Sequence, residues 1–161
     1  MNKLTLNPSY RAVPTDNSSI KLLVFEIGKL TLALPILQVQ KVIKYQDIHG
    51  SGLSHVNLIH LEQQQVVVVD LHQKLFKVKL HQTSSNSNKG YFIISKKATG
   101  ELLAIAVSQS PTIIDVNRDR IRALPETYRR ADTLGIASHV ALIFESETPL
   151  TIFILDLDRL I

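Results

Sequence analysis

The chain has 161 residues, of which 45% are hydrophobic and 20% charged, and its formal net charge is +4. These values are typical of a soluble globular domain, or of two small barrels that share a core. The absence of cysteine excludes disulfides, thiolate metal ligands and a cysteine nucleophile, and agrees with a cytoplasmic location. No apolar run has the length of a membrane span, and the basic excess is too small for a dedicated nucleic-acid binder.

The beginning of the chain differs in composition from the rest. Residues 1–19 are polar, lack periodicity and contain no apolar signal core. We therefore expect residues 1–20 to be a flexible N-terminal tail, followed by one domain over residues 21–161.

The remainder predicts an all-β protein with scraps of helix, because runs rich in Val, Ile and Leu alternate with turn residues. The expected strands are 21–27, 30–34, 41–45, 56–62, 65–69, 91–95, 102–107, 113–116, 136–144 and 150–155. Turns are expected at 28–29, 63–64, 98–100 and 145–149, an irregular basic segment at 118–130, and helical turns after Pro35, at 70–76 and at 156–161.

Two stretches of the chain repeat one pattern. From Val66 to Phe76, and again from Phe153 to Ile161, an apolar run precedes Asp-Leu and a short segment that ends in two large apolar residues. The run predicts a buried strand, and the Asp predicts the cap of a helical turn. The repeat indicates two similar half-domains, which we expect to be divided near residues 77–90. Five strands per half is enough to close a small barrel and so to protect the strand edges.

The sequence contains no recognisable catalytic or metal-binding pattern. It has no His-Glu-x-x-His, no Gly-x-Ser-x-Gly and no Gly-x-x-x-x-Gly-Lys. Capping explains Asp70, Asp156 and Asp158 better than acid–base catalysis does, because each follows a strand. The six histidines are interpreted as structural or surface residues: His49, His55, His60, His72, His81 and His139. We therefore predict no enzyme activity, no metal and no cofactor.

A cluster of arginines is the one charge feature to be weighed. It consists of Arg118, Arg120, Arg122, Arg129 and Arg130, with acidic residues among them. This mixture predicts a solvated surface, and a docking site for an acidic protein is the second interpretation. Nucleic acid is the weakest interpretation, because only one aromatic residue is near enough to stack on bases.

Several short segments occur in one order along the chain. In the first half they are Phe25-Glu26-Ile27-Gly28, Pro35-Ile36-Leu37-Gln38-Val39-Gln40 and Val68-Val69-Asp70-Leu71. In the second half they are Leu103-Ala104-Ile105-Ala106-Val107, Ile113-Ile114-Asp115-Val116, Ile121, Leu124-Pro125-Glu126, Gly135-Ile136-Ala137 and the closing run from Ile154 to Ile161. In this order and spacing they resemble the CheW-like domain family, the coupling module of bacterial chemotaxis arrays.

The resemblance implies two intertwined five-stranded SH3-like barrels. It also implies a non-enzymatic cytoplasmic adaptor that couples a chemoreceptor to a CheA-type histidine kinase in a chemotaxis, phototaxis or motility array. The implied partners are the CheW-like regulatory domain of the kinase and the cytoplasmic tip of the receptor, without nucleic acid or direct membrane insertion. The alternative is an SH3-like barrel module that binds nucleic acid or another signalling protein.

The chain departs from the family pattern at two charged positions. Members usually carry Asn-Leu-Arg-Gly before the central strand and a proline inside it, where this chain has His60-Leu61-Glu62-Gln63 and Val67. The arginine position, which helps the family bind receptor and kinase, is therefore Glu62, and Lys41 stands where an acidic residue is frequent. Because both charges are reversed, we expect a divergent coupling protein with altered partner contacts.

The resemblance also implies which residues meet the partners. In the first half of the chain these are Val39, Gln40, Lys41, Glu62 and Gln63. In the second half Ile105 and Val107 are candidates, although a strand residue of this kind can equally belong to the core.

Overall fold

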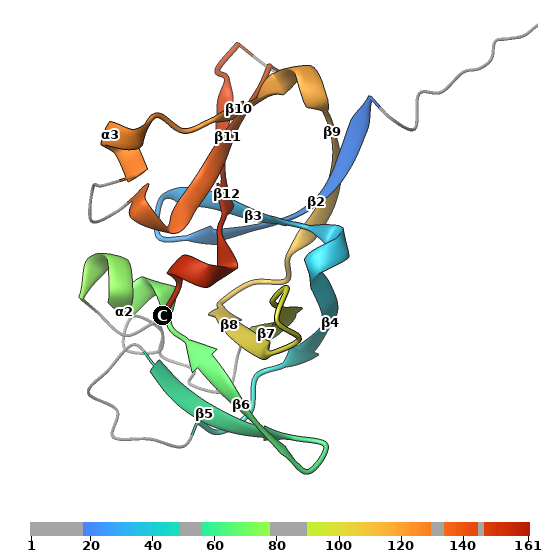
Figure 1. Ribbon diagram of the computed structural model, residues 1–161, viewed down its shortest axis with the longest axis vertical. Helices are drawn as coiled ribbons and strands as arrows, with labels where there is room; N and C mark the ends of the chain where they lie inside the picture. Colours follow the sequence, from blue (N-terminus) through green and yellow to red (C-terminus); the bar gives the residue numbers. More distant parts are fainter. Residues whose placement is uncertain (1–17, 49–55, 78–89, 130–133, 145–146) are drawn as a thin grey trace, which may run out of the picture.

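The computed structural model describes residues 18–48, 56–77, 90–129, 134–144 and 147–161, and its strands form two sheets (Figure 1). The strands are β2 (Ser19–Ile27), β3 (Leu30–Pro35), β4 (Val39–Lys44), β5 (Val56–Leu61), β6 (Gln64–Val69), β7 (Tyr91–Lys96), β8 (Leu102–Val107), β9 (Thr112–Asn117), β10 (Ile121–Ala123), β11 (Ala137–Ile143) and β12 (Leu150–Leu155). The helical turns are η2 (Ile36–Gln38), α2 (Leu71–Phe76), η4 (Arg118–Arg120), α3 (Glu126–Arg129), η5 (Leu134–Ile136) and η6 (Leu157–Arg159). None of these described helices is long and apolar enough to cross a membrane.

The two sheets share one plan, and their hairpins are exchanged. In the five-stranded sheet, of order β4-β7-β8-β6-β5, the hairpin β7–β8 lies between β4 and the parallel strand β6. In the six-stranded sheet, of order β10-β11-β12-β3-β2-β9, the hairpin β2–β3 lies between β9 and the parallel strand β12. Each hairpin therefore completes the sheet built mainly from the other half of the chain, and the expected intertwining is confirmed.

This exchange corrects the expected division of the chain. Strands β4, β5 and β6 precede residues 77–90, and β7 and β8 follow them, yet all five strands belong to one sheet. The division near 77–90 therefore does not separate the sheets. Residues 78–89, residues 1–17 of the expected tail and part of the turn expected at 145–149 lie outside the described residues.

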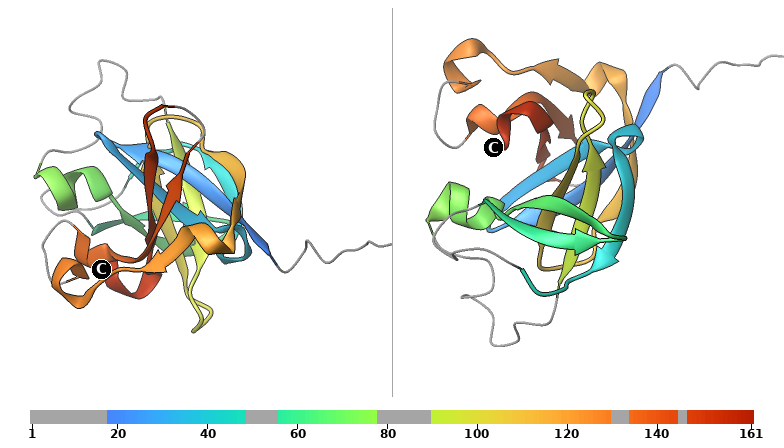
Figure 2. Two further views of the ribbon diagram at one scale, coloured as in Figure 1. Left: turned by 90° about the horizontal axis from the view of Figure 1, so that it is seen from above. Right: turned by 60° about the horizontal axis from the view of Figure 1, so that its bottom comes forward.

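The internal repeat extends to single residues. Val68 pairs with Ala104 between the parallel strands β6 and β8, and Ile154 pairs with Ala33 between the parallel strands β12 and β3. The predicted capping aspartates follow two residues after Val68 and Ile154, at Asp70 and Asp156. Asp70 Oδ1 accepts a hydrogen bond from the Gln73 amide at 3.0 Å. In the second unit, Asp156 Oδ1 accepts one from the Asp158 amide at 3.1 Å. In all views α2 and η6, the two capped turns, lie on the same side of the molecule (Figures 1 and 2).

Alternation along the strands divides the apolar residues among three clusters. One face of β8 contributes Ala104 and Ala106 to the interior of the five-stranded barrel. The equivalent face of β3 contributes Ala33 to the interior of the six-stranded barrel. The opposite faces of these hairpins meet in a third cluster, the seam core, which joins the two barrels. Its buried members are Leu23, Phe25, Ile27, Leu32, Leu34, Val69, Leu71, Ile93, Leu103, Ile105, Val107, Ile136, Leu155, Leu157 and Leu160.

Two local expectations need correction. The turn between β5 and β6 consists of Glu62 and Gln63, at φ 51° and 68°, so it begins one residue before the expected 63–64. Two consecutive positive φ values are those of the two-residue turn whose twist suits a hairpin. The segment expected to be irregular over 118–130 contains the short strand β10, which pairs with β11 and makes six strands in that sheet.

The seam core predicts the effect of truncating a residue within it. Ile105 has 0% exposure there, so Ile105→Ala should lower the free energy of unfolding by about 2–5 kcal/mol in urea denaturation. Ile113→Ala is the matched control, because Ile113 is 57% exposed and its truncation should change stability by less than about 0.5 kcal/mol. Equal effects of the two substitutions would contradict this assignment of the seam.

Candidate functional site

The first-half candidates lie on β4 and on the β5–β6 turn, and an ion pair connects these two places. Lys41 Nζ is 3.5 Å from Glu62 Oε2. Because β4 and β5 are the two outer strands of their sheet, this contact links its opposite edges and helps to close the barrel. Gln46 reinforces the closure, since its Nε2 donates to the carbonyl oxygen of His60 at 3.1 Å.

The ion pair matters more for the surface charge than for stability. The Glu62 side chain is 79% exposed and the Lys41 side chain 39% exposed, so solvent screens their attraction to about 0–1 kcal/mol. The two charge reversals seen in the sequence are therefore neighbours in space, and each neutralises the other. Beside them Gln40 and Gln63 are exposed, and Val39 is half-buried against the seam core.

The second-half candidates are not on the surface. Ile105 and Val107 both have 0% exposure and belong to the seam core. They are buried because β8 is a central strand of its sheet: one face packs in the interior of the five-stranded barrel and the other in the seam core. These two residues can support a partner surface only indirectly, and the expectation that they contact a partner is corrected.

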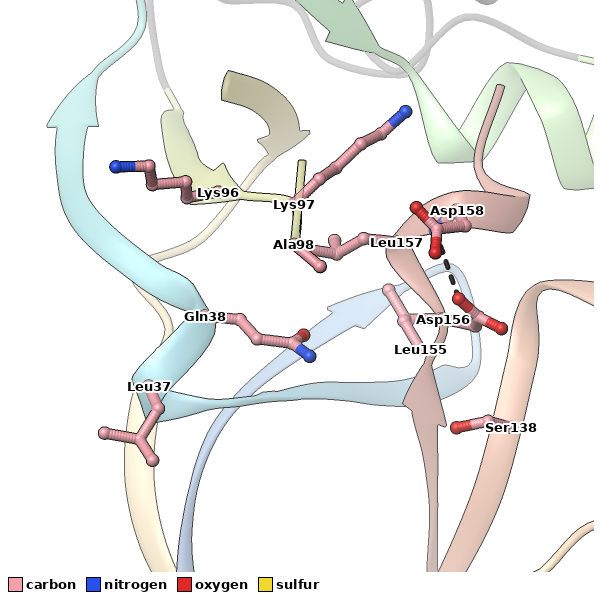
Figure 3. A pocket seen from close by; sticks show the side chains of 10 residues that line it. All are labelled: Leu37, Gln38, Lys96, Lys97, Ala98, Ser138, Leu155, Asp156, Leu157 and Asp158. Carbon is pink, nitrogen blue, oxygen red and sulfur yellow. Dashed lines mark hydrogen bonds between the residues drawn. The ribbon is translucent and has the colours of Figure 1, made fainter. Parts of the chain in front are cut away.

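A groove lies beside η2, where this turn leads into β4. One part, of about 450 Å³, is bounded by η2, by the β7–β8 turn and by the segment around η6 (Figure 3). A second part, of about 430 Å³, shares Gln38, Ser138 and Leu155 with the first. Gln38 points into the groove, and its Oε1 is buried without a hydrogen-bond partner among the described residues (Figure 3). The η2 turn, which lines this groove, directly precedes the candidate residues Val39, Gln40 and Lys41 in the chain.

An arginine network holds one wall of the groove. Asp156 Oδ2 lies 3.6 Å from Arg129 Nη2 and 3.8 Å from Arg159 Nε. Arg159 Nη1 donates in turn to the carbonyl oxygens of Gly135 at 3.0 Å and of Arg129 at 3.4 Å. The carboxylate of Asp156 is therefore neutralised and fixed, so it joins α3, η5 and η6 into one wall.

The opposite wall is cationic. Lys96 and Lys97 line the groove at the β7–β8 turn, and neither has an ion pair within the part of the chain that the structure describes. With Asp156 neutralised, only the exposed Asp158 opposes these two ammonium groups. The groove therefore has a basic side and an apolar floor at Leu155 and Leu157, which suits a polypeptide segment better than a reacting small molecule.

Sequence reasoning missed the most exposed apolar residue near the groove. Leu37 is 96% exposed on η2 and lines the rim of the groove (Figure 3). The adjacent pair Ile36-Leu37 carried the signal, because two neighbouring residues of a tight turn cannot both point toward the core. Ile36 packs on the seam core, which leaves Leu37 to solvent.

Among the described residues no group of three or more His, Asp or Glu side chains is arranged to hold a metal ion. His139 Nδ1 lies 2.8 Å from Ser138 Oγ, and His72 packs edge-on against Phe76 at 5.2 Å between ring centroids. Burial, and then the charges of Asp47 and Asp70, raise the pKa of Tyr45, which lies outside the groove. The expected roles of His49, His55 and His81 fall outside the described residues.

The chain is similar to known proteins in both sequence and fold. The model of the CheW-like domain family matches residues 21–161. Among solved structures, the chain is similar to the scaffolding protein TtCheW from Thermoanaerobacter tengcongensis, with a TM-score of 0.69 and 18% identity over 95% of this chain and 91% of that one. At this identity the likeness shows the fold, two SH3-like barrels. No curated protein matches the chain.

The network around Asp156 predicts an asymmetry between two neighbouring aspartates. Asp156→Ala removes the cap and also the carboxylate that faces Arg129, whose Nε is buried without a partner among the described residues. We expect the free energy of unfolding to fall by about 1–3 kcal/mol in urea denaturation. Asp158→Ala should cost less than about 0.5 kcal/mol, because only the Asp158 backbone is engaged. Equal losses would show that the network does not fix this wall.

Proposed function

The chain belongs to the CheW-like domain family, and from that premise we propose that it is a cytoplasmic adaptor coupling a chemoreceptor-type sensor to a CheA-type histidine kinase. The proteins of this family are scaffolds rather than enzymes. The observation that carries the proposal is the match of the family model over residues 21–161. We extend the proposal to the chain's organisation, in which residues 21–161 form the coupling domain. The expected tail is shorter than residues 1–20, because Ser19 and Ile20 lie in β2 and pair with Asn117 and Val116 of β9.

We propose that the kinase meets the barrel edge that carries Lys41 and Glu62. Each residue reverses a charge that is usual in the family, and the 3.5 Å contact between them supports a joint role. A cognate regulatory domain would present an acidic group to Lys41 and a basic group to Glu62. Like charges brought together at an interface cost enough to reject other partners. The reversed pair would thus select the cognate kinase.

Glu62→Arg tests this contact and is paired with the double variant Lys41→Glu/Glu62→Arg. The single variant breaks the internal ion pair, and the double variant restores it with opposite polarity. Both should weaken binding of the CheA-type kinase regulatory domain roughly tenfold or more, because each opposes the partner's charges. Isothermal titration with the regulatory domain of the kinase encoded nearest to this chain provides the measurement.

Lys29→Glu is the control, since Lys29 is exposed in the β2–β3 turn, away from this edge. It should leave the affinity unchanged. Recovery of wild-type affinity by the double variant would mean that only the internal ion pair matters. Unchanged affinity in all variants would exclude this edge as the kinase contact.

We propose that the receptor tip occupies the groove beside η2. A groove with an apolar floor and polar walls is the kind of surface that receives a helical segment. Leu37 supports this assignment, because an apolar side chain 96% exposed at the rim gains most from a partner that covers it.

Leu37→Asp should therefore weaken receptor binding without affecting the fold. We expect at least a tenfold loss of affinity for a receptor-tip fragment in a pull-down or titration, since an apolar contact is replaced by a charge. Ile113→Asp is the matched control, because Ile113 is exposed on β9 and lines neither part of the groove. If both variants bind the fragment as the wild type does, the groove is not the receptor contact.

A further inference from the structure

The arginines of the cluster differ in their contacts: some belong to the groove or its ion pairs, and others are exposed without an ion pair among the described residues. Arg129 faces Asp156, and Arg118 lines the groove. Arg130 lies outside the described residues. Arg120 and Arg122 remain, exposed at η4 and β10, and neither has an ion pair among the described residues. These two guanidinium groups do not line the groove, although their chain neighbours Arg118 and Ile121 do.

Both guanidinium groups are held in place by uncharged neighbours. The guanidinium of Arg120 lies over the ring of Phe144, 5.3 Å from the ring centroid. Arg122 Nη1 donates to the carbonyl oxygens of Asp119 at 2.6 Å and Ile121 at 3.1 Å. A guanidinium that packs face-on against a ring still has its N–H groups, which lie in its plane, free to donate to a carboxylate. Because the group is already held in place, it loses little conformational freedom on binding. The two cations are therefore preorganised without being neutralised.

Exposed apolar residues lie beside these cations. Arg122 pairs with Val140 across β10 and β11, so Leu142 and then Phe144 follow on the same face toward η4. Leu142 is 40% exposed and Phe144 58% exposed. We call the surface formed by Arg120, Arg122, Leu142 and Phe144 the arginine face. It lies at the upper end of the six-stranded barrel in Figure 1, away from the five-stranded sheet.

We propose that the arginine face is a second docking surface, which binds an acidic protein segment that also carries apolar side chains. Carboxylates would pair with Arg120 and Arg122, and apolar side chains would cover Leu142 and Phe144. Charge complementarity supports this occupant, because Asp119 is the sole acidic residue within η4 and β10. The partner is a further protein, beyond the kinase and receptor of the proposed function.

The composition of the face favours a protein over nucleic acid. A single-strand binder stacks bases on free aromatic rings along a basic track. Here the one ring, Phe144, is already covered by Arg120, and the track has two cations. Two cations and two apolar side chains match a short acidic and apolar peptide, for which we expect modest affinity because the contact area is small.

The proposal is tested with a fluorescein-labelled synthetic peptide in which glutamates flank leucines. Fluorescence anisotropy should show saturable binding to the full chain. Arg120→Ala/Arg122→Ala should weaken binding roughly tenfold or more, since charge-assisted contacts are removed. Phe144→Ala should also weaken it, because both the apolar contact and the support of Arg120 are lost.

The control is Lys29→Ala/Lys44→Ala, which removes the same charge from two exposed lysines elsewhere on the surface. It should bind the peptide as the wild type does. The proposal is overturned if the peptide does not bind, if the arginine variant binds it equally, or if the control loses as much affinity. It is also overturned if a poly-dT oligonucleotide or phosphatidylglycerol vesicles bind more tightly than the peptide. Because Glu62→Arg leaves the arginine face intact, that variant should retain the peptide, so failure of the kinase contact is distinguishable from failure of this proposal.

Discussion

Burial of two hairpins against each other is the interaction on which this molecule depends. The hairpins β2–β3 and β7–β8 each turn one face toward a barrel interior and the other toward the seam core. Small residues, Ala33 and Ala104, face the interiors where the parallel strands meet. Larger residues such as Leu32 and Leu103 face the seam. Because each hairpin completes the other half's sheet, neither barrel closes without strands from both halves of the chain.

Much of this fold was predictable from the sequence because it follows local rules. Apolar runs bounded by turn residues located most strands, and the repeated Asp-Leu located the capped turns at Asp70 and Asp156. The exchange of hairpins was not predictable from the residues alone, since a strand's pattern reports that its faces are buried and not which strand it pairs with. For the same reason the sequence leaves Ile105 and Val107 open between a partner surface and the core, and the structure places them in the seam core. The exposure of Leu37 required the three-dimensional course of η2.

The contacts that a charged side chain makes determine its role on the surface as much as its position in the sequence does. Lys41 and Glu62 stand apart along the chain, and their contact turns two departures from a family pattern into one reversed pair. The arginines show the opposite relation. Arg120 and Arg129 are close in sequence, but one lies over an aromatic ring and the other is held by Asp156. A basic segment that looks uniform in the sequence therefore supports one wall of the groove and also a separate exposed face.

The proposed adaptor must hold two partners at once. The edge proposed for the kinase, at Lys41 and Glu62, and the groove proposed for the receptor share no residue. The most direct test is analytical ultracentrifugation of the chain with the kinase regulatory domain and a receptor-tip fragment together. The account predicts a ternary complex that contains all three proteins. Displacement of one partner by the other, or association with neither at tens of micromolar, a range in which specific but transient complexes are detected, would contradict it.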